Sequence, residues 1–162
     1  MRRDDTYTFK EKIYECDKHI EKIEDAKEYL QELMPLTLEK YLKLNKIESS
    51  FIDQLNFRFS KLQDTIGESI FKSILALSKE DTKKMLFIDI LNRMEELDIV
   101  DKNEWLKLRE IRNEIAHEYS FNQGEVVDNI NLIYKNSDNI KKIYKNICKF
   151  IANKFEIKCR EV

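Results

Sequence analysis

The scarcity of glycine and proline is the feature that most restricts how this chain can fold. Among its 162 residues there are only 2 glycines and 1 proline. These two residue types interrupt helices and form turns, whereas Leu, Ile, Lys and Glu, which dominate here, are compatible with helices. A chain of this length also suits one domain with a buried core. We therefore predict an all-α fold in which residues 1–162 form a single domain, an up-and-down bundle of about five helices.

Apolar residues recur at steps of three and four, the spacing of one face of a helix, along several segments. The predicted helices cover residues 9–33, 51–77, 85–97, 102–119 and 125–155, with a further short segment at 38–44. Ser49 and Ser50 are candidate caps for the helix at 51–77, and Asp101 with Glu104 resembles a capping box that opens the helix at 102–119. The residues of 85–97 expected to face the core are Leu86, Ile90, Leu91 and Met94.

Gly67 lies inside the apolar stripe of the helix at 51–77. A glycine in the middle of a helix costs about 1 kcal/mol relative to alanine, so its presence needs another reason. Close packing between two helices is one reason, and a kink is the other.

The charge balance and the cysteines limit the possible environments and partners. The net charge of −2 excludes a broadly basic surface for nucleic acid, so any contact with RNA must come from a local group of cations. The cysteines Cys16, Cys148 and Cys159 are odd in number and widely spaced, which argues against structural zinc and favours a reducing cytoplasm. We expect neither a signal peptide nor a transmembrane segment.

One face of the helix at 102–119 departs from ordinary amphipathic patterning. Apart from its core face and its charged face, the helix has a third arc of about 160° on the helical wheel. This arc carries neither lysine nor carboxylate, and consists of Arg109, Arg112, Asn113, Ala116, His117 and Tyr119.

The residue types on this arc suit work on a phosphodiester. Arginine presents a planar fork of donors that fits phosphate, and histidine exchanges protons near neutral pH. RNA supplies its own nucleophile, the 2′-hydroxyl, so the enzyme needs to accept that proton, protonate the leaving oxygen and stabilise the phosphate charge. One histidine does not readily fill both proton roles, and nothing in the sequence ties His19 to this helix. A twofold dimer would supply a second copy of the arc.

Each of these residues also has a purely structural interpretation. A lone histidine on a helix is more often structural than catalytic, and the two arginines could be ordinary surface cations paired with glutamates. Tyr119 could simply cover the end of its helix. The patterning by itself leaves these interpretations open.

The same helix resembles the signature of HEPN ribonucleases. That signature is an arginine, four to six residues, a histidine and, in the toxin branch, a tyrosine two positions later, which Arg112, His117 and Tyr119 match. Residues 57–67 resemble the long helix of HepT-like toxins, and residues 87–95 and the Glu104–Trp105 pair are also similar to that group. The resemblance covers residues 50 to 155, and the first helix is compatible with it.

The resemblance implies a homodimeric HEPN helical bundle whose two motif helices line a shared cleft. It implies a cytoplasmic RNA endonuclease without metal or cofactor, the toxin of a type VII toxin–antitoxin system, with Arg112 and His117 as the catalytic pair. Asn113 and Arg109 would support the site. It also implies an antitoxin partner, a minimal nucleotidyltransferase (MNT), that attaches AMP to Tyr119 and thereby brings negative charge and bulk into the cleft.

Two competing functions stay open at this point. Some HEPN proteins are non-catalytic substrate-binding or scaffold partners of nucleotidyltransferases, and a plain structural bundle is the third alternative. Outside the motif helix, we expect Phe57, Phe59 and Phe71 to belong to the core or to a dimer contact rather than to a base-stacking surface. Arg58 and Lys61 could line the same cleft as the motif.

Overall fold

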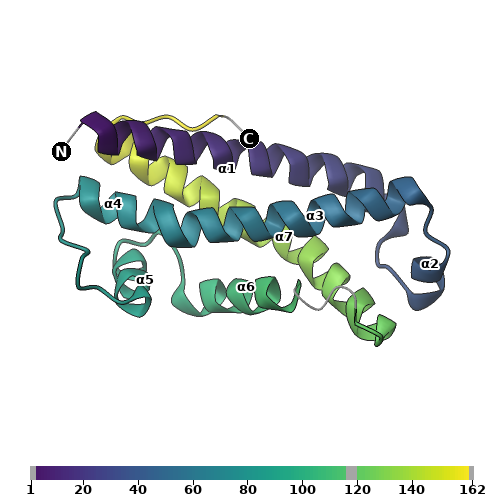
Figure 1. Ribbon diagram of the computed structural model, residues 1–162. Coiled ribbons are helices and arrows are strands. Elements are labelled where there is room, and N and C mark those ends of the chain that lie inside the picture. Colours follow the sequence, from purple (N-terminus) through teal and green to yellow (C-terminus); the bar gives the residue numbers. More distant parts are fainter. Residues whose placement is uncertain (1–2, 116–119, 161–162) are drawn as a thin grey trace.

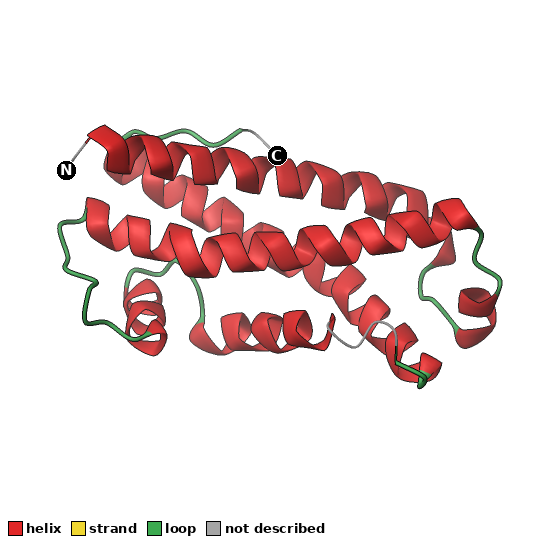
Figure 2. Cartoon of the chain, viewed as in Figure 1, coloured by secondary structure: helices red, strands yellow, loops and turns green. Residues whose placement is uncertain are grey.

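A computed structural model describes residues 3–115 and 120–160, and every regular element in them is helical (Figure 2). This confirms the predicted all-α class. The elements are α1 (Arg3–Leu30), a 3₁₀ turn (Gln31–Leu33), α2 (Leu38–Leu42), α3 (Lys46–Thr65), a π turn (Ile66–Ile70), α4 (Phe71–Leu77), α5 (Phe87–Glu96), α6 (Lys102–Glu114) and α7 (Gln123–Phe155). The π turn joins α3 and α4 into the one long helix expected around Gly67.

The long helices alternate in direction, as the up-and-down prediction requires. Figure 1 shows α3 and α4 returning along α1, and α7 crossing the bundle in the direction opposite to α6. The contacts between α1 and α3 are the most extensive in the fold, while α6 packs on both α3 and α7. The short α5 lies across the end of the bundle near α4 and α6 (Figure 1).

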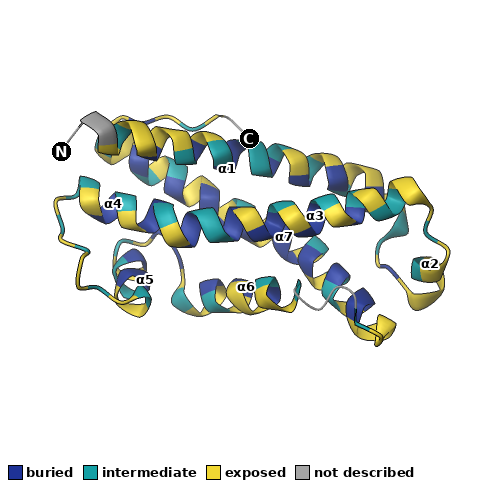
Figure 3. Ribbon diagram, in the orientation of Figure 1, coloured by how far each residue is buried: buried dark blue, intermediate teal, exposed yellow. Residues whose placement is uncertain are grey.

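The apolar stripes of α1, α3, α4 and α7 face one another and form the core (Figure 3). Burying such stripes provides most of the stability of helices in a bundle, because isolated helices are marginal in water. Ile90, Leu91 and Met94 of α5 are buried as predicted, but Leu86 is 69% exposed. That part of the prediction is wrong because Leu86 precedes the helix and takes its N-cap position.

The start of α3 differs from the prediction. Asn45, rather than Ser49 or Ser50, caps this helix: its side chain accepts a hydrogen bond from the Glu48 backbone N–H at 2.8 Å, and the Glu48 carboxylate accepts one from the Asn45 N–H at 2.9 Å. This reciprocal pair satisfies two N–H groups that lack partners within the helix. The helix therefore begins five residues before residue 51. The start of α6 agrees with the prediction, since Asp101 accepts a hydrogen bond from the Glu104 N–H at 2.9 Å.

The chain after α7 turns back and runs along α1 (Figure 1). The Arg160 backbone N–H donates to the buried carboxylate of Asp17, which also accepts a hydrogen bond from the hydroxyl of Tyr144 at 2.7 Å. A disulfide joins Cys148 to Cys159, and their Cα atoms lie 5.7 Å apart. The returning segment brings Cys159 back beside α7, a proximity that the spacing of the cysteines along the sequence did not indicate. Cys16 is free and buried.

Gly67 allows α6 to approach the long helix closely. A Cβ atom built on Gly67 would lie only 3.1 Å from Cζ2 of the completely buried Trp105, the first core residue of α6. Close packing was one of the two expected reasons for a glycine here, and the structure confirms it. The π turn at the same position adds a local irregularity to the long helix.

We expect Gly67→Leu to lower the free energy of unfolding by about 1–3 kcal/mol, the usual cost of overpacking. Leucine is the better helix former by close to 1 kcal/mol, so a net loss would isolate the collision with Trp105. Chemical denaturation measures the effect, and Ala76→Leu at an exposed position of α4 is the control. Equal stability of Gly67→Leu and the wild type would contradict the close packing.

Candidate active site

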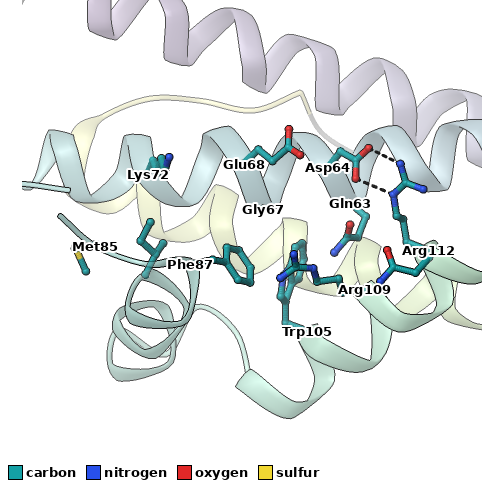
Figure 4. A pocket seen from close by; sticks show the side chains of 12 residues that line it. Gln63, Asp64, Gly67, Glu68, Lys72, Met85, Phe87, Trp105, Arg109 and Arg112 are labelled. Atoms are coloured by element: carbon teal, nitrogen blue, oxygen red, sulfur yellow. Dashed lines mark hydrogen bonds and ion pairs between the residues drawn. The ribbon is translucent and has the colours of Figure 1, made fainter. Parts of the chain in front are cut away.

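The structure places three of the five predicted site residues in one wall of a single cavity. Arg109, Arg112 and Asn113 lie on the second half of α6 and line a cavity of about 640 Å³ between α6, α5 and the long helix (Figure 4). Helix α6 ends at Glu114, before the predicted end at residue 119. His117 and Tyr119 lie outside the described residues, three and five positions beyond this helix end.

Arg112 is paired with a carboxylate from another helix, which a helical wheel of α6 alone cannot show. Its Nε and Nη2 groups donate to the two carboxylate oxygens of Asp64 on α3, at 2.9 and 3.0 Å (Figure 4). These hydrogen bonds raise the pKa of the Arg112 guanidinium, so the group stays positively charged. An arginine has five N–H donors, and the pairing with Asp64 leaves the others for a ligand. The pair fixes the guanidinium plane rather than removing its capacity to bind an anion.

Carboxylates are therefore part of this site. The predicted arc of α6 carries none, but Asp64 and Glu68 from the long helix line the cavity opposite it. The cationic groups in the lining are Lys72, Arg109 and Arg112. The cavity thus has mixed charge with a small cationic excess, and it can orient a single phosphate better than it can attract a polyanion from a distance. Asp64 lies within residues 57–67, a stretch that carries part of the resemblance to HepT-like toxins. That resemblance is the sequence feature that could have pointed to Asp64 as a site residue.

The rest of the lining is apolar and aromatic. The cavity residues of this kind are Met85, Phe87, Ile90 and Trp105. The Arg109 guanidinium lies over the Phe87 ring, 4.7 Å from its centroid, a cation–π contact that holds the arginine against the wall. Nothing in the sequence pattern indicated this wall, because Phe87 and Met85 come from the opening of α5 and the loop before it.

His19 belongs to a different part of the molecule. It lies on α1, half-buried, with its Nδ1 atom 3.2 Å from Nη1 of Arg58 on α3. Burial lowers the pKa of His19, and the positive charge of Arg58 lowers it further. Its nitrogen therefore accepts the arginine's hydrogen bond as neutral imidazole. Among the described residues no histidine lines the cavity that contains Arg112.

The second group of cations lies outside the cavity that contains Arg112. Arg58 and Lys61 do not line the cavity, and both lie near the ring of Phe57, at 5.4 and 5.6 Å from its centroid. Phe59 and Phe71 are completely buried, as expected of core residues, whereas Phe57 is 52% exposed. The core interpretation is therefore confirmed for two of the three phenylalanines, and Phe57 is not part of the core.

The described residues contain neither a metal-binding cluster nor a helix able to span a membrane. No group of three or more His, Cys, Asp or Glu side chains is arranged to hold a metal ion in residues 3–115 and 120–160. None of the helices in these ranges has the length and apolar character needed to cross a membrane.

Comparison of the chain with models of protein families, with curated proteins and with solved structures finds no match. The resemblance to HEPN ribonucleases therefore rests on the residues of the sequence that carry it.

The pairing of Arg112 with Asp64 predicts a measurable coupling. In a double-mutant cycle with Arg112→Ala and Asp64→Ala, we expect a coupling free energy of about 1 kcal/mol, because the pair is bidentate yet each side chain is still roughly 30% exposed. Urea denaturation of the four proteins measures it. Glu39 and Lys43, a pair on α2 and its C-cap with side chains 80% and 75% exposed, form the control cycle and should show no coupling. Additive losses at Arg112 and Asp64 would contradict the pairing.

The lowered pKa of His19 predicts a pH dependence of stability. The unfolded chain binds a proton at His19 more readily than the folded chain, so this residue's contribution to stability is complete above its ordinary pKa of 6.5 and is lost as the pH falls below it. His19→Asn keeps an acceptor for Arg58 but does not titrate, and we expect a flatter stability profile between pH 7.5 and about pH 5. Parallel denaturation series of the two proteins measure the difference, because every group that both proteins share contributes equally to the two profiles. Identical profiles would show that His19 is not protected from protonation.

Proposed function

We propose that this chain is a metal-independent RNA endonuclease of the HEPN superfamily, the toxin of a type VII toxin–antitoxin pair. The observation that carries the proposal is the placement of Arg112. Its guanidinium is clamped by Asp64 on the wall of a cavity that Arg109 and Asn113 also line, directly before the segment that holds His117 and Tyr119. Arginine, histidine and tyrosine at the motif spacing are then consistent with one site at the end of α6.

The proposed reaction uses the 2′-hydroxyl of the substrate as nucleophile. A histidine base takes the proton from this hydroxyl, the 2′-oxygen bonds to phosphorus, and the bond from phosphorus to the 5′-oxygen breaks. The leaving 5′-oxygen receives a proton from an acid, and the products are a 2′,3′-cyclic phosphate and a 5′-hydroxyl end. The free N–H groups of Arg112 stabilise the charge that develops on the phosphate oxygens, and Asn113 and Arg109 support the site.

Two proton transfers favour a composite site in a homodimer. Each chain has two histidines, His19 and His117, and His19 lies between α1 and α3 with its Nδ1 turned to Arg58. Within one chain, His117 is then the one histidine near the motif. A twofold dimer would bring a second His117 to the cleft, so that one imidazole acts as base and the other as acid.

Regulation and location follow from the same proposal. An MNT nucleotidyltransferase antitoxin would attach AMP to Tyr119. The negative charge of the added phosphate would repel RNA, and the bulk of the AMP group would fill the cleft. Action on RNA places the chain in the cytoplasm, where disulfides are kept reduced. Cys148 and Cys159 would be thiols there, and the C-terminal segment would still be held by its hydrogen bond to Asp17 and by the pairing of Arg160 with Glu21.

Loss of the proposed catalytic groups should abolish cleavage. We expect the wild type to arrest growth when expressed alone and to cut single-stranded RNA in the presence of EDTA. His117→Ala and Arg112→Ala should each lower the cleavage rate by about 100-fold or more, since a general acid–base group and a donor that stabilises transition-state charge each contribute at least that factor. A fluorescently labelled RNA measures the rate, and thermal unfolding verifies that each variant folds. Lys107→Ala, which removes an exposed cation from the opposite face of α6, is the matched control and should leave the rate unchanged.

Two outcomes would contradict parts of this proposal. If the wild type and His117→Ala affect growth and RNA equally, the chain is a non-catalytic binding or scaffold partner rather than an enzyme. If a folded monomer retains full activity, the composite dimer site is wrong.

A further inference from the structure

The apolar half of the cavity has no task in the proposed phosphate chemistry. Binding and cleaving a phosphodiester needs charged and proton-carrying groups, yet Met85, Phe87, Ile90 and Trp105 provide a hydrophobic wall beside them. The volume of about 640 Å³ is in the range of pockets that enclose an organic ligand. A flat apolar group bound next to a phosphate would use both halves of the cavity.

Gln63 and Trp105 provide polar groups in this cavity. Gln63 is only 5% exposed, and the buried indole N–H of Trp105, which lines the same cavity, has no hydrogen-bond partner among the described residues. Figure 4 shows the Gln63 amide pointing from α3 toward α6, between Trp105 and Arg112. An amide that lines a cavity can both donate and accept hydrogen bonds, and a buried N–H without a partner is unfavourable, so a ligand that offers both a donor and an acceptor would be bound preferentially.

The contact between Arg109 and Phe87 provides a flat surface at the same wall. The Phe87 ring carries the guanidinium on one face, and Arg109 is exposed, so the outer side of the guanidinium is open to a second planar group. Arginine planes and aromatic rings are the surfaces on which proteins stack the unpaired bases of single-stranded RNA, while amide groups hydrogen-bond to the base edges.

Gln63 and the phosphate-binding arginine are linked through the backbone of α3. Gln63 directly precedes Asp64, and Asp64 holds Arg112 through two hydrogen bonds. The amide and the guanidinium are therefore positioned by the same turn of one helix. A phosphate at Arg112 and a base at this wall would share the one cavity that both line.

We infer that the cavity is a nucleobase pocket for the RNA nucleotide next to the scissile phosphate, in which Gln63 reads the edge of the base and Arg109 on Phe87 stacks with it. The inference rests on the proposed ribonuclease function and deepens it: the substrate is single-stranded at the cut, and the cut has a base preference. A base paired in a duplex could not enter, because its edge and both faces are already occupied.

The single tryptophan of the chain allows a direct binding test. Trp105 lines the cavity and there is no other tryptophan in the sequence, so its fluorescence reports on this pocket. We expect at least one of the four nucleoside 5′-monophosphates to change the fluorescence with saturation, and inorganic phosphate alone to give no such change. Gln63→Met should weaken that nucleotide's binding by about tenfold, the value of one good amide–base contact.

Matched variants separate the pocket from general effects on the helix. Gln54→Met changes the same side chain on α3, but Gln54 lies outside this cavity and donates to the Lys22 carbonyl, so nucleotide binding should equal that of the wild type. Gln63→Glu has nearly the same shape as the wild type but replaces the amide donor by a carboxylate, so it should also lose nucleotide binding. It provides the test if the Gln63→Met protein does not fold.

A short oligonucleotide with 2′-deoxyribose at the cut position, which lacks the nucleophile, should bind more tightly than the monophosphate.

A cleavage assay on a randomised single-stranded RNA gives the second measurement. The wild type should cut beside a preferred base, and Gln63→Met should cut with a weaker preference while Gln54→Met keeps the wild-type pattern.

The pocket is refuted if no nucleotide changes the Trp105 fluorescence, if both Gln63 variants bind as the wild type does, or if the monophosphate binds and the oligonucleotide does not. The titration needs no cleavage, so nucleotide binding without any RNA cleavage would overturn the ribonuclease and leave the pocket. Cleavage without a fluorescence response would overturn the pocket alone.

Discussion

The contact of the Trp105 indole with the backbone at Gly67 sets the position of α6 on the long helix. Because Gly67 has no side chain, the largest residue of α6 can bury itself completely at this point, within van der Waals distance of the helix. The rest of the site depends on that spacing. It brings Arg112, two turns further along α6, to the carboxylate of Asp64, and it leaves space between α5 and α6 for the cavity.

The electrostatics of the site follow from the same arrangement. The long helix contributes carboxylates and α6 contributes guanidinium groups, so the two sets of charges face each other across the cavity. A site of this kind discriminates by geometry more than by long-range attraction, since neighbouring opposite charges cancel at a distance. This agrees with a chain whose net charge is −2.

Most of the helices could be predicted because apolar spacing and the lack of glycine and proline are local properties. The boundaries were less accurate where two caps competed: Asn45 and Ser49 are both good capping residues, and only the position of Glu48 relative to Asn45 makes the reciprocal hydrogen bonds possible. Leu86 has the right spacing for the core but precedes the helix, so its side chain points to solvent. The disulfide partners, Cys148 and Cys159, were not predictable because the chain reverses after α7.

The sequence by itself determined the helical class, the approximate helices and the grouping of Arg109, Arg112 and Asn113 on one face, because all of these follow from periodicity along a single helix. The tertiary structure decided which groups from elsewhere meet that face: Asp64 at the guanidinium of Arg112, Phe87 under Arg109, and the buried amide of Gln63. It also decided that His19 lies apart, with Arg58. The physical reason is that these contacts join helices far apart in the chain, and their relative placement depends on packing volumes such as the missing side chain of Gly67, which no local pattern encodes.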